Sequence, residues 1–258
     1  MGHETLTVEV DDRLAVVTIS RPEVRNALNR QVIAELRDAL GVLADADDVG
    51  LVAFTGAGDK AFVAGADIAQ LRHYDLHTGL DAEMQRTFDA IEAFPKPTVA
   101  AVNGFALGGG CELAMACDIR IAAENARFGL PETTLSVLPG AGGTQRLARL
   151  VGTGRAIEMI LTSRFVAAAE AHAIGLATSV VPLDGLRAEL RRLADQILAK
   201  GPLAVRLAKL VVRAGMDADQ HTGQVVGRLA QALLYTTADK AEGASAFLEK
   251  RSPTFRGL

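Results

Sequence analysis

The chain has 258 residues, of which 49% are hydrophobic and 22% charged, a composition typical of a globular protein with a sizeable core. Its formal net charge of −4 argues against a nucleic-acid-binding protein, which would need a basic stripe. The two cysteines, Cys111 and Cys117, lack zinc-site spacing and indicate a reduced, cytoplasmic compartment. We expect no nucleic-acid partner.

One stretch could be mistaken for a membrane span. Residues 98–117 carry a single formal charge, at Glu112, but they also contain Asn103 and four glycines, which are poorly suited to lipid. This stretch therefore predicts a buried strand, a turn and a buried helix. The polar start of the chain has no signal-peptide pattern, so we expect no membrane insertion.

The first half of the chain alternates predicted strands with predicted helices. A hairpin is expected around Asp11-Asp12, between β-branched runs at residues 5–10 and 14–20. Apolar periodicity and turn residues then predict strands at 50–55, 98–102 and 119–122, and helices at 28–43, from about 68, at 80–94 and at 108–117. This alternation predicts an α/β domain with parallel strand pairing.

The chain becomes helical after Gly143. Helices are predicted at 144–151, 155–161, 167–173, 186–199 and 202–214, and Gly152, Gly175 and Gly201 separate several of them. We therefore expect the last third of the chain to be a helical region.

The segment from Asn103 to Arg146 combines glycine clusters with two carboxylates. Glu112 stands in apolar surroundings just after three consecutive glycines, and Glu132 follows Pro131. Glycine allows a backbone to approach a ligand closely, and a carboxylate in apolar company is costly unless it is used. The combination indicates acid/base chemistry beside backbone N–H donors. A simple tight turn with a surface carboxylate is the alternative for each feature alone.

Two weaker motifs compete with this interpretation. Residues 56–61, GAGDKA, match the dinucleotide pattern G-x-G-x-x-G/A, and Asp75 lies about 20 residues beyond. Against it, Gly65 falls where the helix of that motif should run. His73 and His77 are four residues apart on a predicted helix, but no third metal ligand is evident, so we expect surface histidines and no metal site.

Ten short motifs, in the same order along the chain, resemble those of enoyl-CoA hydratases in the crotonase superfamily. They are Arg21-Pro22, Asn26-Ala27-Leu28, Ala64-Gly65-Ala66-Asp67, Asn103-Gly104, Gly108-Gly109-Gly110-Cys111-Glu112, Phe128-Gly129, Pro131-Glu132, Pro139-Gly140, Gly142-Gly143 and Lys250-Arg251. The resemblance implies an α/β fold built as a spiral of ββα units, with a catalytic core at 1–196 and a helical trimerisation region at 197–258. It also implies a homotrimer or a dimer of trimers.

The resemblance further implies a reaction and its residues. The family binds acyl-CoA thioesters, and a hydratase adds water reversibly to trans-2-enoyl-CoA without a separate cofactor. By resemblance, the N–H groups of Ala66 and Gly109 form the oxyanion hole. Glu112 would activate the water, Glu132 would protonate C2, and the N–H of Gly140 would help to hold the water.

The CoA contacts are expected at the Ala64–Ile68 segment and at two cations. By resemblance, the backbone groups of Ala64, Ala66 and Ile68 line the adenine pocket, and Asp67 is also expected to bind CoA. Many relatives carry Lys where this chain has Ala69, so phosphate binding would depend on Arg25 and on Lys250 or Arg251, with the latter two expected from this chain or from a neighbouring subunit. An isomerase or another acyl-CoA lyase of the same fold is the alternative enzyme, and a non-catalytic CoA- or nucleotide-binding protein is the alternative of a different class.

Overall fold

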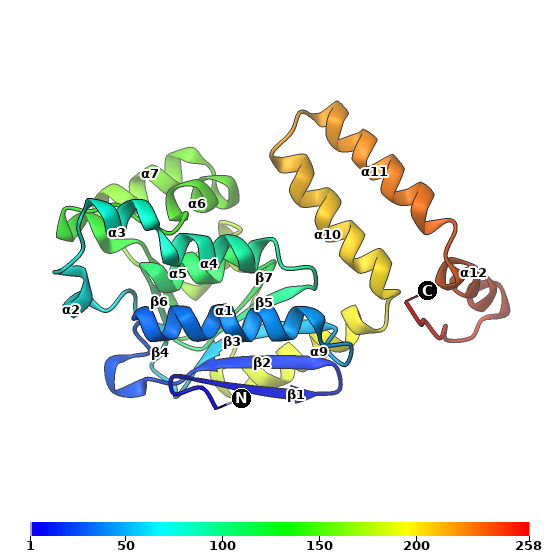
Figure 1. The fold of residues 1–258 in the computed structure, drawn as a ribbon, viewed down its shortest axis with the longest axis horizontal. Coiled ribbons are helices and arrows are strands. Elements are labelled where there is room, and N and C mark those ends of the chain that lie inside the picture. The colour runs from blue at the N-terminus through cyan, green and yellow to red at the C-terminus, as the bar shows by residue number, and fades with distance from the viewer. Residues whose placement is uncertain (1, 258) are drawn as a thin grey trace. The chain divides into compact units, whose positions relative to one another are not determined.

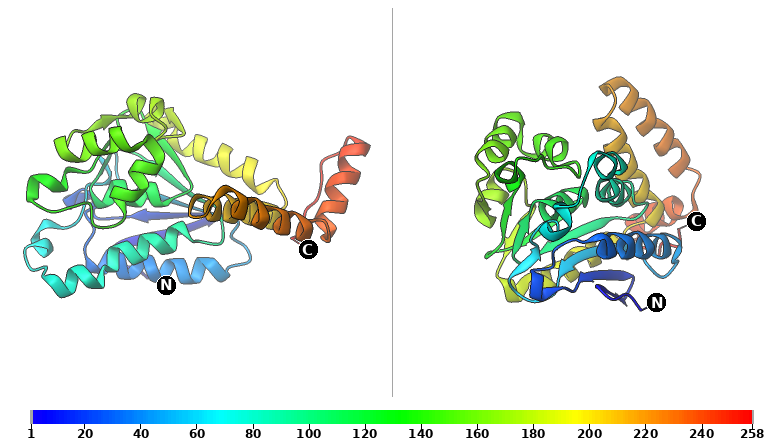
Figure 2. Two further views of the ribbon diagram at one scale, coloured as in Figure 1. Left: turned by 90° about the horizontal axis from the view of Figure 1, so that it is seen from above. Right: turned by 60° about the vertical axis from the view of Figure 1, so that its left-hand side comes forward.

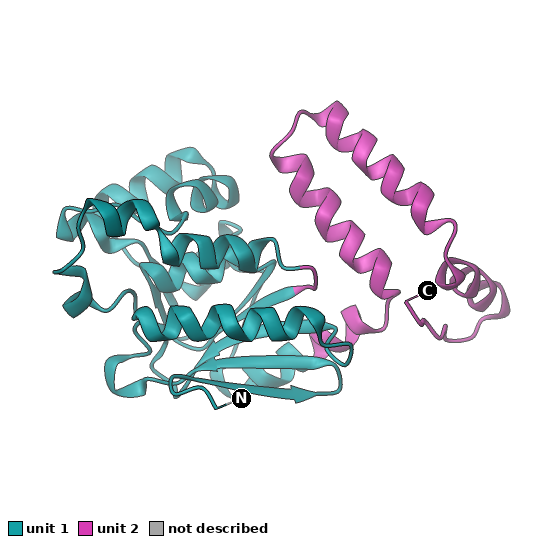
Figure 3. Ribbon diagram, viewed as in Figure 1, with its two compact units in different colours: residues 1–94, 98–191 teal, residues 95–97, 192–258 magenta. Residues whose placement is uncertain are grey.

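The computed structural model describes residues 2–257 and divides into two compact units (Figure 3). The first unit comprises the chain up to residue 94 together with residues 98–191, and the second comprises residues 95–97 and the chain from 192 onward. Within the described residues, no helix is both long and apolar enough to cross a bilayer. The domain boundary expected from the resemblance, between 196 and 197, stays a prediction.

A six-stranded sheet forms the centre of the first unit (Figure 1). Its order is β1 (Leu6–Asp11), β2 (Leu14–Ile19), β3 (Leu51–Gly56), β5 (Thr98–Val102), β7 (Ile119–Ala123) and β10 (Ser179–Val181). The β1–β2 pair is the expected antiparallel hairpin, and the remaining pairs are parallel, as the alternation of elements predicts. Val17, Phe54 and Ala100 lie opposite one another across three strands, and all three are buried.

A smaller four-stranded sheet has the order β4 (Ala61–Val63), β6 (Phe105–Leu107), β8 (Arg127–Gly129) and β9 (Val166–Ala167). β4, β6 and β8 are parallel, and each directly follows a strand of the large sheet, namely β3, β5 and β7. This repeat, a long strand, then a short strand, then helix, is the expected spiral of ββα units. None of these short strands is predicted as a strand above, because three residues are too few to show a strand periodicity.

The helices of the first unit cover the sheets and shape the site. They are α1 (Arg30–Asp45), α2 (Ile68–Leu71), α3 (Leu76–Asp81), α4 (Glu83–Glu92), α5 (Gly109–Ala116), α6 (Gly143–Val151), α7 (Thr153–Thr162) and α8 (Ala168–Ala173); α9 (Leu186–Leu198) runs on into the second unit. Asn29 caps α1 by accepting a hydrogen bond from the Val32 N–H at 2.9 Å. α1 and α4 pack side by side, as Figures 1 and 2 show.

The prediction of a single helix at 80–94 is wrong because two helices, α3 and α4, meet within that range. Ala82 has a φ of 48°, a left-handed conformation that ends α3 and separates it from α4. The break follows local hydrogen bonding that apolar spacing does not report: the Asp75 side chain accepts from the Thr78 N–H at 2.8 Å and starts α3.

The loop at residues 56–61 contradicts the dinucleotide alternative. It leads from β3 into β4, starting at Ala61, and not into a helix. The Asn26 amide donates to two backbone carbonyls in this segment at 3.0 and 2.8 Å, and the Asn103 amide donates to two others at 2.8 and 2.7 Å. Asn125 donates to a fifth at 3.1 Å. The glycines of the motif thus serve a compact turn that is held by asparagine side chains.

The second unit contains the three C-terminal helices α10 (Pro202–Met216), α11 (Gln220–Leu234) and α12 (Ala238–Glu249). α10 and α11 form an antiparallel hairpin (Figure 1). After α12 the chain folds back on it: Asp239 accepts hydrogen bonds from the N–H groups of Arg256 and Gly257 at 2.7 and 2.8 Å. Large apolar side chains remain exposed on all three helices, among them Leu210, Val212, Leu229, Leu233 and Phe247.

Candidate active site

The start of α5 places Glu112 deep in the first unit. Gly108, with φ 51°, precedes the helix, and a Cβ on Gly110 would lie 2.0 Å from the Val63 carbonyl oxygen. Only glycine therefore lets α5 approach β4 this closely. Glu112 follows in the first turn and is 2% exposed, at the helix end where the dipole favours negative charge.

Two backbone N–H groups hold one oxygen of Glu112. Oε1 accepts from Ala141 at 2.7 Å and from Gly143 at 2.8 Å. A Cβ on Gly143 would lie 2.8 Å from the same oxygen, so a larger residue would displace the carboxylate. Burial raises the pKa of Glu112, while the two N–H bonds and the positive charge of Arg146 act in the opposite direction.

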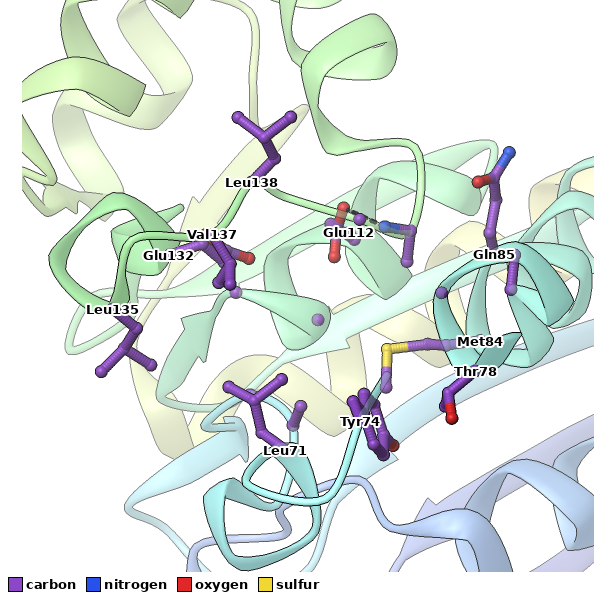
Figure 4. Close-up of a pocket in the computed structure, with 18 of the residues that line it drawn as sticks. Leu71, Tyr74, Thr78, Met84, Gln85, Glu112, Glu132, Leu135, Val137 and Leu138 are labelled. Carbon is purple, nitrogen blue, oxygen red and sulfur yellow. Dashed lines mark hydrogen bonds between the residues drawn. The ribbon is translucent and has the colours of Figure 1, made fainter. Parts of the chain in front are cut away.

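Glu132 faces the same cavity with one oxygen unpaired. It lies in a short 3₁₀ turn, Pro131–Leu135, and its Oε2 is buried without a hydrogen-bond partner among the described residues. Burial, and then the charge of Glu112, raise the pKa of Glu132 to about 7. Figure 4 shows both carboxylates projecting into one cavity. Glu132 can therefore gain or lose a proton near neutral pH, beside Glu112, whose Oε1 is fixed by two backbone N–H groups.

Two unpaired N–H donors lie beside the carboxylates. The Leu28 N–H donates to Gly65 and the Asp67 N–H donates to Leu28, both at 2.8 Å, which turns the amide of Ala66 away from this bridge. Gly109 begins α5, where N–H groups have no partner within the helix. Neither N–H has an acceptor within residues 2–257, and a Cβ on Gly109 would lie 3.8 Å from the Ala66 nitrogen.

The carboxylates and the free N–H groups open onto a cavity of about 1010 Å³. Its apolar wall includes Leu71, Tyr74, Met84, Leu135, Val137 and Leu138, which Figure 4 shows around the two carboxylates. A cavity of this size, apolar with a few convergent polar groups, suits an elongated organic ligand. The arrangement can stabilise a negative oxygen at the N–H pair and move protons at the carboxylates.

Comparison with known proteins now identifies the family. A family model described as enoyl-CoA hydratase/isomerase matches residues 9–257. The chain belongs to the enoyl-CoA hydratase/isomerase family. It is 47% identical over 257 residues to a crotonyl-CoA hydratase of Syntrophomonas wolfei, covering 99% of both chains. It is 43% identical over 253 residues to a short-chain-enoyl-CoA hydratase of Clostridium acetobutylicum, covering 97% of both.

The solved structures agree with this membership. An enoyl-CoA hydratase from Bacillus anthracis superposes with a TM-score of 0.96 at 40% identity, over 99% of this chain and 100% of that one. The crotonase-like α/β fold and the enoyl-CoA hydratase/isomerase family predicted from the ordered motifs are thereby confirmed.

The predicted CoA-binding residues of this family member fall into two groups. Ala64, Ala66 and Ile68 line the cavity, but Asp67 is not among the described residues that do. Its carboxylate accepts from the N–H of residue 69 at 3.1 Å, which caps α2, and lies 3.5 Å from Arg21. Asp67 therefore shapes the turn that carries its neighbours.

The cations predicted to bind the CoA phosphates differ from the arginine that lines the cavity. Arg25 is absent from the described cavity wall, whereas the exposed Arg30, five residues later at the start of α1, is part of it. Lys250 belongs to the second unit. Arg30 is an addition that sequence analysis missed, because nothing in its local pattern sets it apart from other first-turn arginines.

Gly140 lines the cavity, as expected, and its N–H has no acceptor within the described part of the chain. The donors that hold Glu112 are Ala141 and Gly143, to which the sequence analysis assigned no such role. The glycine cluster at 140–143 was the available signal. Small residues allow the loop to run close to a buried carboxylate.

The two histidines do not share a helix. His73 lies in the turn after α2 and His77 lies in α3, so the prediction of one helix through both is wrong. Both side chains are exposed, as expected. Across residues 2–257, no group of three or more His, Cys, Asp or Glu residues could hold a metal ion.

Proposed function

We propose that this protein is an enoyl-CoA hydratase that adds water reversibly to trans-2-enoyl-CoA and gives a 3-hydroxyacyl-CoA. The observation that carries the proposal is the pair Glu112 and Glu132, two carboxylates that face one cavity beside two unpaired N–H groups. Relatives that are 43–47% identical over nearly the whole chain are named as hydratases of this kind.

The thioester oxygen would bind between the N–H groups of Ala66 and Gly109. As water attacks C3, the electrons of the double bond move toward this oxygen and form an enolate. Both N–H groups are available to donate hydrogen bonds to the negative enolate oxygen, and the dipole at the N-terminus of α5 stabilises the same charge. Each such donor is typically worth about 3–4 kcal/mol of barrier.

Glu112 would act as the base and Glu132 as the acid. Since Oε1 of Glu112 already accepts two N–H bonds, its other oxygen is the one to take a proton from water. The Gly140 N–H would help to hold that water. Glu132, with a pKa of about 7, would deliver a proton to C2 of the enolate. In the reverse reaction the two carboxyl groups exchange roles.

The CoA moiety would contact the segment that carries the oxyanion donor. Ala64, Ala66 and Ile68 would contribute backbone groups to the adenine pocket, and Asp67 would hold the turn that carries them. Arg25 and Lys250 remain proposed phosphate ligands, and Arg30 joins them because this residue lines the cavity.

The remaining features belong to the same proposal. No metal or redox cofactor takes part, since acid/base chemistry and an oxyanion hole suffice for hydration. The protein is a cytoplasmic homotrimer or dimer of trimers, and its two buried cysteines, which form no disulfide among the described residues, suit a reducing compartment.

A turnover screen tests the function. Purified protein, treated exhaustively with a chelator, is supplied with trans-2-enoyl-CoA thioesters of increasing length, and formation of 3-hydroxyacyl-CoA is followed by chromatography. We expect hydration that survives chelation. Conversion of a 3-enoyl-CoA to the 2-enoyl isomer without hydration would favour the isomerase alternative instead. Thioester binding without any turnover would favour a non-catalytic protein.

A further inference from the structure

Arg146 of α6 is a nearly buried arginine, 8% exposed, that uses all three guanidinium nitrogens. Nε donates to Glu92 at 2.8 Å and Nη2 donates to Asp89 at 2.6 Å, both on α4. Nη1 donates to the backbone carbonyl of Ala141 at 2.8 Å. A planar fork with this many partners is fixed in one orientation, which a lysine could not reproduce.

Ala141 connects this guanidinium to the site. Its carbonyl accepts from Arg146, and its N–H donates to Oε1 of Glu112 at 2.7 Å. The next residue, Gly142, has a φ of 94°, and a Cβ there would lie 2.2 Å from Nη1 of Arg146. The loop is therefore wrapped around the guanidinium, and its geometry depends on that group.

The two carboxylates that pair with Arg146 lie on a helix that also lines the cavity. α4, which carries Asp89 and Glu92, also carries Met84 and Gln85 of the cavity. Arg146 thus joins a helix that lines the cavity to the loop that holds the proposed base.

We propose that Arg146 is a positioning residue for the hydration reaction: by tying the Ala141 carbonyl to Asp89 and Glu92, it fixes where the Glu112 carboxylate stands. This inference rests on the proposed hydratase function. It assigns to Arg146 no contact with substrate, and its effect reaches the reacting atoms through Ala141 and Glu112.

The charges around Glu112 make this role measurable. The titratable and charged groups near it are Cys111 on its own helix, Glu132 across the cavity and Arg146 from α6, with Asp89 and Glu92 behind the guanidinium. Because Arg146 favours the ionised form of Glu112, its removal raises the pKa of Glu112. A base that must be ionised then becomes active only at higher pH.

Arg164 offers a matched control. It too joins two carboxylates, Glu158 at 2.6 Å and Glu170 at 2.8 Å, within the first unit. It is absent from the described wall of the cavity. Replacing it removes an ion-pair clamp to two carboxylates, more exposed than that of Arg146, without touching the loop that holds Glu112.

The experiment compares Arg146→Met, Arg146→Lys and Arg164→Met in the full-length protein. Activities are scaled to the folded fraction, and kcat and KM are measured across pH. We expect Arg146→Met to lower kcat by about 10²-fold, the typical effect of displacing a catalytic group by about 1 Å. KM should change little, and the acid limb of the profile should move to higher pH. Arg146→Lys keeps the charge but not the fork, so kcat should fall while the acid limb stays.

Arg164→Met should lose stability only, with kcat per folded molecule and the pH profile unchanged. The proposal is overturned if Arg146→Met retains wild-type kcat, or if its acid limb stays in place. Should Arg146→Met fail to fold, Arg146→Lys decides: reduced kcat at unchanged KM supports the role, and wild-type kcat contradicts it. If the wild-type protein hydrates no enoyl thioester, the proposed function fails, which is a separate outcome.

Discussion

The two carboxylates of the site are held in opposite ways. Glu112 has one oxygen anchored by two N–H groups, whereas Glu132 has a buried oxygen with no partner among the described residues. Burial raises the pKa of both groups; the two N–H bonds to Glu112 oppose that rise, whereas the charge of Glu112 adds to it at Glu132. This difference in local hydrogen bonding gives two chemically identical side chains two different roles.

Replacing either carboxylate by its amide should abolish hydration but spare binding. We expect Glu112→Gln and Glu132→Gln each to lower kcat by about 10²–10⁴-fold, since an amide fills the space but cannot carry the proton. Steady-state kinetics measures the loss, and titration with a saturated acyl-CoA measures binding. Because the two act on one water, the double variant should be little worse than the worse single one. A fully active Glu132→Gln would contradict the two-carboxylate mechanism.

The pH profile should report the proton on Glu132. With its pKa raised to about 7, this carboxyl is protonated below that value and ionised above it. As a general acid it must be protonated, so kcat/KM for hydration should fall as pH rises through about 7. In Glu112→Gln the neighbouring negative charge is gone, so an NMR titration should find the pKa of Glu132 lowered. An unchanged pKa would contradict the coupling of the two groups.

At the scale of elements, glycines and asparagines determine the turns between strands and helices, which apolar periodicity does not predict. The sequence predicted the strands and helices with long apolar patterns, including the hairpin and α5. It missed β4, β6 and β8, because three-residue strands have no readable period. It also missed how Asn26 and Asn103 hold the 56–61 turn, since a side chain that bonds to distant backbone leaves no local pattern.

The candidate site shows the same limit. Glu112, Glu132 and the Ala66–Gly109 pair could be predicted, because glycines and carboxylates recur in one ordered set of motifs. Arg146 could not, because its role depends on α4, which lies more than fifty residues away in the chain and is adjacent only after folding. Contacts between elements of different repeats are set by the spiral itself, and not by local sequence.

The Asn103 side chain should matter to stability. We expect Asn103→Ala to lower the free energy of unfolding by about 1–3 kcal/mol, because the carbonyls of Gly56, in a buried hydrogen bond, and Gly58, in a part-buried one, lose their donor. Urea denaturation measures this change. Asn125→Ala is the control: that side chain is exposed, so water can replace its bonds and the loss should be small. Equal losses for both variants would contradict the role given to burial.

At the scale of the whole molecule, the C-terminal helices leave apolar side chains in water. Val212 is 68% exposed, Leu229 is 65% and Phe247 is 84%. Exposed apolar surface of this kind marks a protein–protein interface, and closed symmetry is the usual way to bury it.

We therefore expect the protein to sediment as a trimer or a dimer of trimers at micromolar concentration, and not as a 27.1 kDa single chain. A Leu229→Lys, Leu233→Lys double variant should weaken the assembly, since each ammonium would have to be buried at the interface. Analytical ultracentrifugation of both proteins checks this, with an exposed site such as Asp47→Lys as the control. A monomeric wild-type protein would contradict the proposed assembly.

The raised pKa of Glu132 has a thermal consequence. Burial and the charge of Glu112 raise this pKa to about 7, so at and above neutral pH the ionised carboxyl group destabilises the folded state relative to the unfolded chain. Glu132→Leu removes that penalty, so its melting temperature should exceed that of the wild type, as differential scanning calorimetry can measure, while hydration is lost. At this position heat tolerance and turnover are opposed. A directed-evolution campaign that selects only for thermostability would be expected to discard the very carboxyl group on which the chemistry depends.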